Sequence, residues 1–285
     1  MSESMGYALG ALLFYGLADF VYKRGAAAGA APHHFLMVQT WFFNPCALLY
    51  GLMTGTLAFN AAALWGAAAG VCAVVGYYNF ASSLRSGSIS TNATIFRLSF
   101  AVTVALAVLV LGEPLTRLKL AGLVLVVLAV WLLLATPRAE SVGIRRDNNS
   151  SRAQVLVATV VVGVLSFIYK VGLRQGATPI SLVVTQAFVA ITLATGFTAY
   201  LDRRIRPSRA AWRYAPVAAV LLVIAFIFLA KGLKNGEASV VVPVAQMGFV
   251  VTALLGFLLL REPFTARQGA GLAAALAALM CLAVG

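Results

Sequence analysis

Charged residues are scarce in this chain of 285 residues. Asp, Glu, Lys and Arg make up 10% of the sequence, whereas soluble proteins carry about 25%. Hydrophobic residues make up 62%, and the mean hydropathy is +0.95. A water-soluble fold could not bury that much apolar surface, so a soluble protein is excluded. Uncharged runs of about 20 residues can cross a bilayer as helices, and an integral membrane protein is therefore predicted.

The residue types from which enzymes build active sites are also rare. The chain has two His, eight acidic residues and three Cys, and it contains no His-Glu-x-x-His motif. Cys46, Cys72 and Cys281 lie within apolar runs without metal-ligand spacing, so they are expected to be small packing residues. His33 and His34 lie between two apolar runs, and no metal is expected there. These shortages argue against an enzyme, a metal site or a bound cofactor.

Basic residues, in contrast, exceed acidic ones and give a net charge of +13. On a soluble surface this charge would suggest a nucleic-acid partner, but here the basic residues lie in short segments between apolar runs. Charges in such segments orient a protein in the membrane and face anionic lipid, so no nucleic acid is expected. Most Lys and Arg follow odd-numbered spans, which would place both termini outside the cell.

The apolar runs divide the chain into ten predicted membrane-spanning helices. Helices are expected because the runs lack the alternation of strands and because a helix pairs its own backbone groups. The polar segment PRAESVGIRRDNNSSR, at 137–152, separates five spans from five. The predicted spans are 6–22, 34–53, 61–84, 90–111, 118–135, 154–173, 180–201, 214–233, 239–260 and 266–284.

A repeated pattern relates the two halves of the chain. DFVYKRGAAAGAAP at 19–32 returns as SFIYKVGLRQGATP at 166–179, LRSGSIS at 84–90 as LKNGEAS at 233–239, and LGEPLT at 111–116 as LREPFT at 260–265. Because each half has an odd number of spans, the second half must enter the membrane from the opposite side. The predicted fold is therefore all-α, with two inverted five-helix repeats at 1–136 and 153–285. Such repeats are typical of secondary transporters, whose substrate site lies between the halves near the midplane.

These motifs resemble the drug/metabolite transporter superfamily, in particular its ten-span EamA-type carriers. FYGLADFVYKRG at 14–25 is similar to the first span of that family, and LGEPLTRLKLAGLVLVVLAVWLL at 111–133 is similar to its fourth and fifth spans. Gln39 and Gln186 stand where family members often carry Arg. The narrower resemblance is to YddG-type exporters of aromatic amino acids. It implies efflux of small metabolites through a cavity lined by spans one to four and six to nine, with spans five and ten peripheral.

Two ionisable residues inside predicted spans are candidate transport residues, because a charge in lipid usually faces a cavity or a partner. Arg97 is expected either to attract a substrate carboxylate or to bond internally to helix carbonyls or Asp19. Asp19 could carry a coupling proton, although we favour a local ion pair with Lys23, about one helical turn away. Lys23 and Lys170 are expected to extend from helix ends toward the membrane surface.

Polar and aromatic side chains within the spans are further candidates for lining a substrate cavity, the alternative being helix packing. Aromatic surfaces beside a few polar groups suit an amino acid with a flat or apolar side chain. Pro243 removes a backbone hydrogen bond within the ninth span, and Gln246 is the repeat counterpart of Arg97. The candidates are Trp41, Asn44, Tyr77, Tyr78, Asn79, Thr94, Phe96, Tyr169, Gln186, Pro243 and Gln246.

The sequence thus predicts a secondary transporter in the cell inner (plasma) membrane that exports small metabolites. Amino acids with aromatic or large neutral side chains are the expected substrates. A carrier of another cargo, such as a nucleobase, drug cation or lipid-linked sugar, is the alternative, and a membrane-embedded enzyme is a weaker one. The expected partners are a small-molecule substrate and the lipid bilayer, and a monomer is the expected unit.

Overall fold

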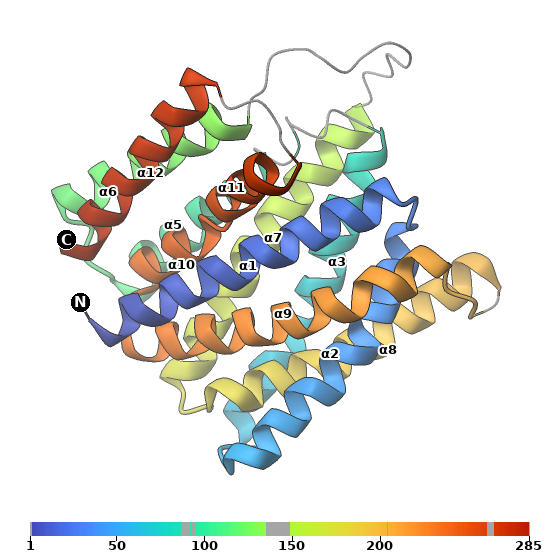
Figure 1. The fold of residues 1–285 in the computed structure, drawn as a ribbon. Coiled ribbons are helices and arrows are strands. Elements are labelled where there is room, and N and C mark those ends of the chain that lie inside the picture. The colour runs from blue at the N-terminus through green and yellow to red at the C-terminus, as the bar shows by residue number, and fades with distance from the viewer. Residues whose placement is uncertain are drawn as a thin grey trace.

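The structure is a computed structural model that describes residues 2–86, 92, 95–134, 149–203, 205–260 and 265–284. Every regular element within these residues is a helix (Figure 1). Eight helical stretches of the described residues are long and apolar enough to cross a membrane, one of them being Ala238–Leu255, and Ile95–Leu111 is a shorter apolar stretch. The prediction of an all-helical membrane protein is confirmed, whereas the count of ten spans stays a prediction.

The helices follow one another along the chain with short connections. A 3₁₀ helix, η1 (Ala61–Leu64), leads into α3. The helices are α1 (Glu3–Ala27), α2 (Pro32–Thr54), α3 (Trp65–Ser86), α5 (Ser99–Leu111), α6 (Arg117–Leu134), α7 (Asn149–Arg174), α8 (Pro179–Asp202), α9 (Arg209–Asn235), α10 (Ala238–Gln246), α11 (Phe249–Leu260) and α12 (Ala266–Val284).

Helix ends agree closely with the sequence pattern because proline and polar residues mark them. Pro32 and Pro179, which are equivalent in the repeat, begin α2 and α8, since proline is readily accommodated at the first helical position. α12 coincides with the predicted span 266–284, whereas α1 and α9 extend several residues beyond theirs. α7 begins at Asn149, so the last residues of the segment expected as a linker are helical, and residues 135–148 lie outside the described part.

The predicted continuous spans 90–111 and 239–260 are wrong in one respect, because each contains a break. Leu98 forms a turn before α5, and Met247 forms one between α10 and α11. At each turn the amide bonds to the carbonyl three residues earlier, with N–O distances of 3.0 Å at Leu98 and 3.1 Å at Met247. Leu98 and Met247 are equivalent positions of the two halves, so both halves interrupt their fourth helix at the same point.

Proline alone does not account for these breaks. Pro243 lies inside α10, three residues before its end at Gln246. The first half has Thr94 at the equivalent position, outside the described residues, yet it breaks at Leu98 in the same way. The interruption therefore depends on the packing around the turn, which supplies partners for backbone groups that a continuous helix would pair.

Glycines allow the helices next to the breaks to approach closely. A methyl group added at Gly16 of α1 would lie 2.4 Å from the carbonyl oxygen of Gly248, and one added at Gly163 of α7 would lie 2.6 Å from that of Ser99. Both distances are shorter than any real contact, so only glycine fits. Close approach through small residues is the usual way in which membrane helices associate.

Threonine hydroxyls bridge the same two helix pairs. Thr252 Oγ1 donates to the carbonyl of Gly16 at 2.9 Å, and Thr103 Oγ1 donates to that of Gly163 at 2.8 Å. Thr103 and Thr252 are equivalent in the repeat, as are Gly16 and Gly163. The packing of α1 against α11 therefore has a counterpart in the packing of α7 against α5.

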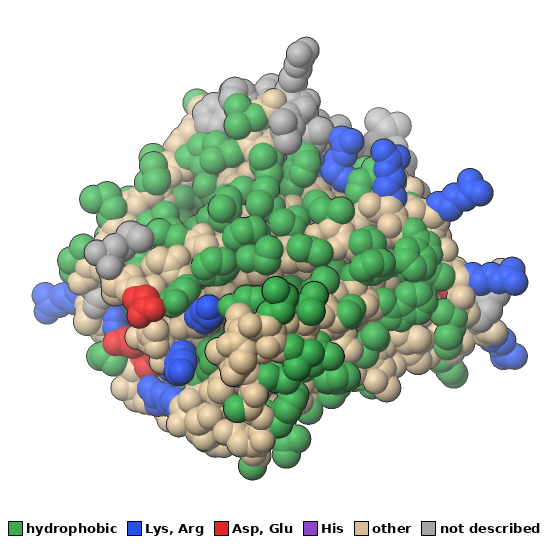
Figure 2. Space-filling view, turned by 60° about the horizontal axis from the view of Figure 1, so that its bottom comes forward, with side chains coloured by type: hydrophobic (Ala, Val, Ile, Leu, Met, Phe, Trp, Pro, Cys, Tyr) green, Lys and Arg blue, Asp and Glu red, His purple; other side chains and the backbone are tan. Residues whose placement is uncertain are grey.

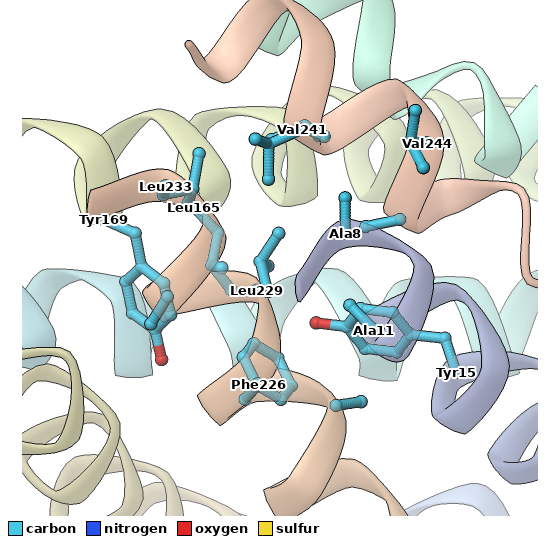
Figure 3. Close-up of a cluster of buried hydrophobic side chains, with 14 of the residues drawn as sticks. Ala8, Ala11, Tyr15, Leu165, Tyr169, Phe226, Leu229, Leu233, Val241 and Val244 are labelled. Atoms are coloured by element: carbon cyan, nitrogen blue, oxygen red, sulfur yellow. The ribbon is translucent and has the colours of Figure 1, made fainter. Parts of the chain in front are cut away.

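An aromatic cluster fills the interior between α1, α7 and α9 (Figure 3). Phe226 of α9 lies between Tyr15 and Tyr169, whose ring centroids are 5.7 and 6.0 Å from its own in near-perpendicular orientations. Leu229 and Val241 continue the cluster toward α10. The apolar core therefore holds α10, and with it the second helix break, against the centre of the bundle.

α6 and α12 lie side by side at one edge of the bundle (Figure 1). Their glycines again permit contact, since Gly122 faces Leu282 and Gly271 faces Leu133. Hydrophobic side chains cover much of the face seen in Figure 2, with Lys and Arg gathered toward its sides. So broad an apolar surface is consistent with contact with lipid.

The close contact between Gly163 and α5 leads to a prediction about stability. Gly163→Ala places a methyl group against the backbone of α5 and should lower the free energy of unfolding by about 1–3 kcal/mol, the usual cost of overpacking. Gly196→Ala is the matched control, because nothing lies within 4 Å of the added carbon and alanine favours a helix. Thermal unfolding in detergent measures both variants. An unchanged melting temperature for Gly163→Ala would contradict the close contact.

Candidate functional site

The first helix break places a buried cation in the interior of the bundle. Arg97 directly precedes the turn at Leu98 and is 8% exposed. Its Nη2 forms an ion pair with Oδ2 of Asp19 on α1, and its Nη1 donates to Oε1 of Gln246 at 3.4 Å. Gln246 directly precedes the second break, so the equivalent residues of the two halves contact one another.

The carboxylate of Asp19 has a different partner from the one favoured on sequence grounds. We expected a local pair with Lys23, but the carboxylate bonds to Arg97, which is 78 residues away in the chain. The side chain of Asp19 is 30% exposed, whereas that of Arg97 is 10% exposed. For Arg97 the internal bond to Asp19 is thus observed, and a role in substrate binding stays a prediction.

Two tyrosine–glutamine hydrogen bonds lie at equivalent places in the halves. The Tyr169 hydroxyl donates to Oε1 of Gln186 at 2.6 Å, and the Tyr22 hydroxyl donates to Oε1 of Gln39. Each glutamine keeps its amide donors for another partner. Tyr22 was absent from the predicted site, although its place in the repeated Tyr-Lys motif, equivalent to Tyr169, is a signal that could have found it.

One predicted aromatic residue, Phe96, lies beside Arg97, and a second, Tyr77, lies beside Phe96. The Phe96 ring is 6.0 Å from the Arg97 guanidinium carbon and stacks on Phe80 at 3.9 Å. Tyr77 of α3 lies 6.3 Å from Phe96, measured between ring centroids. Tyr15 of α1, which was not among the predicted site residues, meets the Phe226 ring of α9 edge-on at 5.7 Å between ring centroids. A flat side chain bound here would find rings on several sides.

Other predicted residues have partners elsewhere in the bundle. Trp41 Nε1 donates to Thr195 Oγ1 of α8 at 2.8 Å, and the Tyr78 ring meets Phe197 edge-on at 4.6 Å. Asn79 bonds within its own helix to the carbonyl of Val75 at 2.8 Å. These contacts fasten α2 and α3 to α8, and they do not bring Trp41, Tyr78 or Asn79 to Arg97.

Three predicted residues remain. Asn44 Oδ1 is buried and has no hydrogen-bond partner among the described residues, so it is an acceptor that a bound molecule could use. Pro243 is buried in α10 one turn before Gln246. Thr94 lies outside the described residues.

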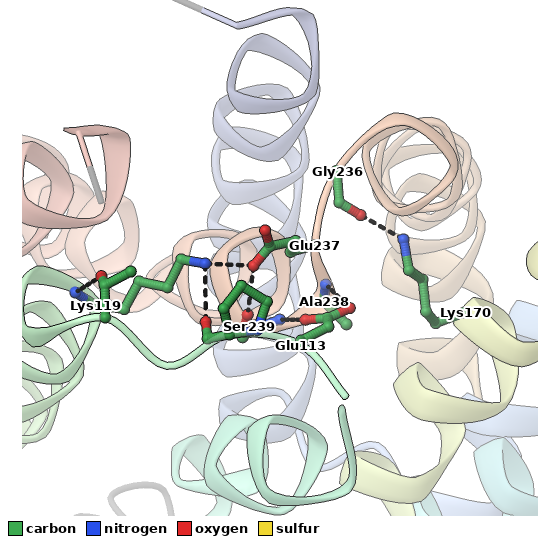
Figure 4. Close-up of polar contacts among 9 residues, drawn as sticks. Glu113, Lys119, Lys170, Gly236, Glu237, Ala238 and Ser239 are labelled. Atoms are coloured by element: carbon green, nitrogen blue, oxygen red, sulfur yellow. Dashed lines mark hydrogen bonds and ion pairs between the residues drawn. The ribbon is translucent and has the colours of Figure 1, made fainter. Parts of the chain in front are cut away.

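A carboxylate bonds to the first backbone amides of α10 (Figure 4). Glu113 accepts hydrogen bonds from the backbone amides of Ala238 at 2.9 Å and Ser239 at 2.8 Å. A carboxylate at a helix N-terminus is favourable because the first amides have no partner within the helix. Lys119 forms an ion pair with Glu237 next to this contact. Glu113 was not predicted as a site residue, although the recurring Glu-Pro motif is a signal that could have found it.

Lys170 bonds to carbonyl groups on the α9 side of the turn between α9 and α10 (Figure 4). Its Nζ donates to the carbonyls of Leu233 at 2.8 Å and Gly236 at 2.5 Å, at the end of α9. The residue is 7% exposed, so the expectation that Lys170 extends to the membrane surface is wrong. The helix end supplies the reason, since its last carbonyls need donors and attract a cation.

A second polar cluster joins the start of α2 to the end of α8. His34 Nε2 lies 2.6 Å from Asp202 Oδ2, and His33 Nε2 lies 3.3 Å from the same atom. The three side chains each offer one atom of a kind that binds metal, all within 4.8 Å of one another. Direct hydrogen bonding already accounts for their arrangement, so we describe the cluster as a link between the helices.

Comparisons with known proteins agree with this architecture. The sequence profile described as the EamA-like transporter family matches residues 4–135 and again residues 152–284. A solved structure described as "Crystal structure of protein" has a TM-score of 0.82, 16% sequence identity and 99% coverage of both chains, so it shares the fold. The uncharacterized protein MJ1333.1 of Methanocaldococcus jannaschii is 35% identical over 71 residues, which span 25% of this chain and about half, 52%, of that relative.

The Arg97–Asp19 ion pair leads to a second prediction about stability. Arg97→Met leaves the Asp19 carboxylate unpaired and should lower the free energy of unfolding by about 2–4 kcal/mol, since breaking a buried pair costs more than removing both partners. The double variant Arg97→Met, Asp19→Leu should recover most of that loss. Arg209→Gln at the exposed start of α9 is the control. Additive losses in the double variant, measured by unfolding in detergent, would refute the coupling.

Proposed function

We propose that this chain, which belongs to the EamA-like transporter family, exports amino acids with aromatic or large neutral side chains by alternating access. A member of this family is a membrane transporter of the drug/metabolite type rather than an enzyme. The observation that carries the proposal is Arg97, a buried guanidinium at a helix break beside aromatic rings. We place the protein in the cell inner (plasma) membrane, acting as a monomer.

The proposed transport cycle depends on two inverted halves, 1–136 and 153–285. Equivalent contacts support this division, since the Thr103–Gly163 bond has its counterpart in Thr252–Gly16 and the two breaks fall at equivalent residues. Halves of the same fold in opposite orientations can exchange conformations, and a site between them then opens to one side or the other.

The substrate's carboxylate would bind Arg97. A guanidinium presents several donors in one plane and binds a carboxylate through two parallel hydrogen bonds. The turns at Leu98 and Met247 lie directly beside Arg97 and Gln246, and carbonyls at such turns suit an ammonium group. The rings of Tyr77 and Phe96 would then face the substrate side chain. An aromatic or large neutral amino acid matches these three features.

Asp19 would compete with the substrate for Arg97. In the structure the Asp19 carboxylate occupies the guanidinium, so a substrate carboxylate must displace it. A proton bound to Asp19 would weaken the ion pair and free Arg97 for the substrate. Release of that proton would restore the pair and expel the substrate. Asp19 is in this way a candidate for coupling transport to protons, and its 30% exposed side chain is accessible for proton exchange.

The Arg97–Asp19 pair also weighs against a drug cation as the cargo. A cation site needs a carboxylate that is free to bind it. Asp19, the acid at this site, is already neutralised by Arg97. Nucleobases and lipid-linked sugars are not favoured by a particular contact, so amino acids remain the preferred class.

Binding of the substrate should stabilise the purified protein. Addition of phenylalanine, tryptophan or leucine at millimolar concentration should raise the melting temperature, because a ligand that binds only the folded state stabilises it. Phenylethylamine and tryptamine, which lack the carboxylate, should not. Arg97→Gln should abolish the shift, whereas Trp41→Phe, which lies away from Arg97, should retain it. Stabilisation by the amines alone would contradict the proposal.

The inverted arrangement can be tested by labelling. Ala28 and Gln175 are equivalent exposed residues after α1 and α7, so single cysteines there should lie on opposite sides of the membrane. Membrane-impermeant maleimide added to intact cells should label one of them, and the other should react only after permeabilisation. Cys46, Cys72 and Cys281 would first be replaced by Ala. Labelling of both positions from one side would refute the inverted halves.

A further inference from the structure

Lys231 is a cation near the end of α9 that forms no ion pair with an acid of the described residues. Its Nζ donates to the Tyr50 hydroxyl of α2 at 3.1 Å and lies 5.7 Å and 5.8 Å from the ring centroids of Tyr7 and Tyr50. The ion pairs among the described residues do not include it. Glu3, an acid at the start of α1, instead accepts hydrogen bonds from Tyr7 and Asn235.

An apolar cavity of about 360 Å³ begins beside this lysine and runs between α2 and α9. It opens on the surface of the bundle, since Val220 of α9, which lines it, is 45% exposed. Apart from Lys231 and the Tyr50 hydroxyl, its lining is apolar. The lining residues are Cys46, Tyr50, Val220, Val223, Ile224, Ile227, Phe228 and Lys231.

This groove lies away from the proposed substrate site. Phe226, which packs against Tyr15 and Tyr169, is 3% exposed and faces the interior of the bundle. Phe228, which lines the groove, packs against α1, where its ring stacks with Phe14 at 5.8 Å. The two faces of α9 therefore meet different surroundings.

The dimensions of the groove match one leaflet of a bilayer. Val220 and Lys231 are eleven residues apart, or about 16 Å along a helix at 1.5 Å per residue. Half of the hydrocarbon core is about 15 Å thick. Lys231 lies one turn before the end of α9, which ends beside the start of α1 (Figure 1). With α9 inserted across a bilayer, the Lys231 ammonium would lie near the depth of the lipid phosphates.

We propose that the groove between α2 and α9 binds an anionic phospholipid. One acyl chain would lie along the apolar lining from Ile224 toward Val220. The phosphate would accept hydrogen bonds from Lys231 Nζ, which has donors to spare, and from the Tyr50 hydroxyl, which accepts from Lys231 and keeps its own proton to donate. Charge complementarity favours an anionic headgroup, because Lys231 has no acidic partner within the part of the chain that the structure describes. This site depends on membrane insertion and not on the identity of the transported substrate.

Lipid titration of the purified protein tests the proposal. Dioleoyl phosphatidylglycerol in detergent micelles should raise the melting temperature and remain bound in native mass spectra, whereas dioleoyl phosphatidylcholine should do so weakly. Lys231→Gln should reduce the apparent affinity for phosphatidylglycerol at least ~tenfold, since hydrogen bonds to charged groups are the stronger ones. Lys234→Gln, an exposed lysine one turn further on, is the matched control and should bind as the original protein does.

Two more variants and one ligand control distinguish a lipid site from misfolding and from simple anion binding. Lys231→Arg keeps the charge and should keep binding, which guards against a loss caused by misfolding alone. Ile224→Trp fills the groove and leaves Lys231 in place, so it should reduce lipid retention. Inorganic phosphate alone should not stabilise the protein. Equal binding of both lipids, equal losses in Lys231→Gln and Lys234→Gln, or full stabilisation by inorganic phosphate would each overturn the proposal.

Discussion

A backbone amide or carbonyl inside a bilayer needs a hydrogen-bond partner within the protein, and this requirement governs the whole structure. A continuous helix meets it alone, but both fourth helices of this chain are interrupted, at Leu98 and Met247. Irregular backbone at membrane depth persists only where protein surrounds it. The short-range hydrogen bonds at these turns and the helices packed around them provide that surrounding. The breaks, in turn, position Arg97 and Gln246.

Specific contacts support these two turns and the turn that leads into α10. Glycine at positions 16 and 163 lets α1 and α7 lie directly against the broken helices, and Thr252 and Thr103 bond across the same contacts. Glu113 and Lys170 pair the exposed backbone groups at the turn between α9 and α10. In water the hydrophobic effect holds helices together, but lipid is as apolar as the helices themselves and supplies no such force. Contacts through small residues and hydrogen bonds at helix ends therefore hold these helices together.

Sequence reasoning located most helices because span length and polar boundaries are local properties. It missed the breaks, since no proline marks Leu98 or Met247 as a helix end, and Pro243 pointed to a place inside α10. It also favoured a residue of the same helix as the partner of Asp19, because helical spacing reveals only contacts within one helix. The observed partner, Arg97, comes close to Asp19 through the packing of different helices. Of the predicted cavity residues, Phe96 and Gln246 contact Arg97, and Tyr77 contacts Phe96. Trp41 and Tyr78 instead contact α8, a distinction that depends on helix rotation.

The contact between Arg97 and Gln246 bears on how such a chain can have arisen from a duplicated half. The two residues occupy the same position of the repeat and touch at 3.4 Å. Two identical copies of the first half, assembled in this way, would bring two guanidinium groups together in a medium that screens charge poorly. Joining the copies into one polypeptide allows that position to differ between them, so a single positive charge can occupy the centre without an identical neighbour to repel it.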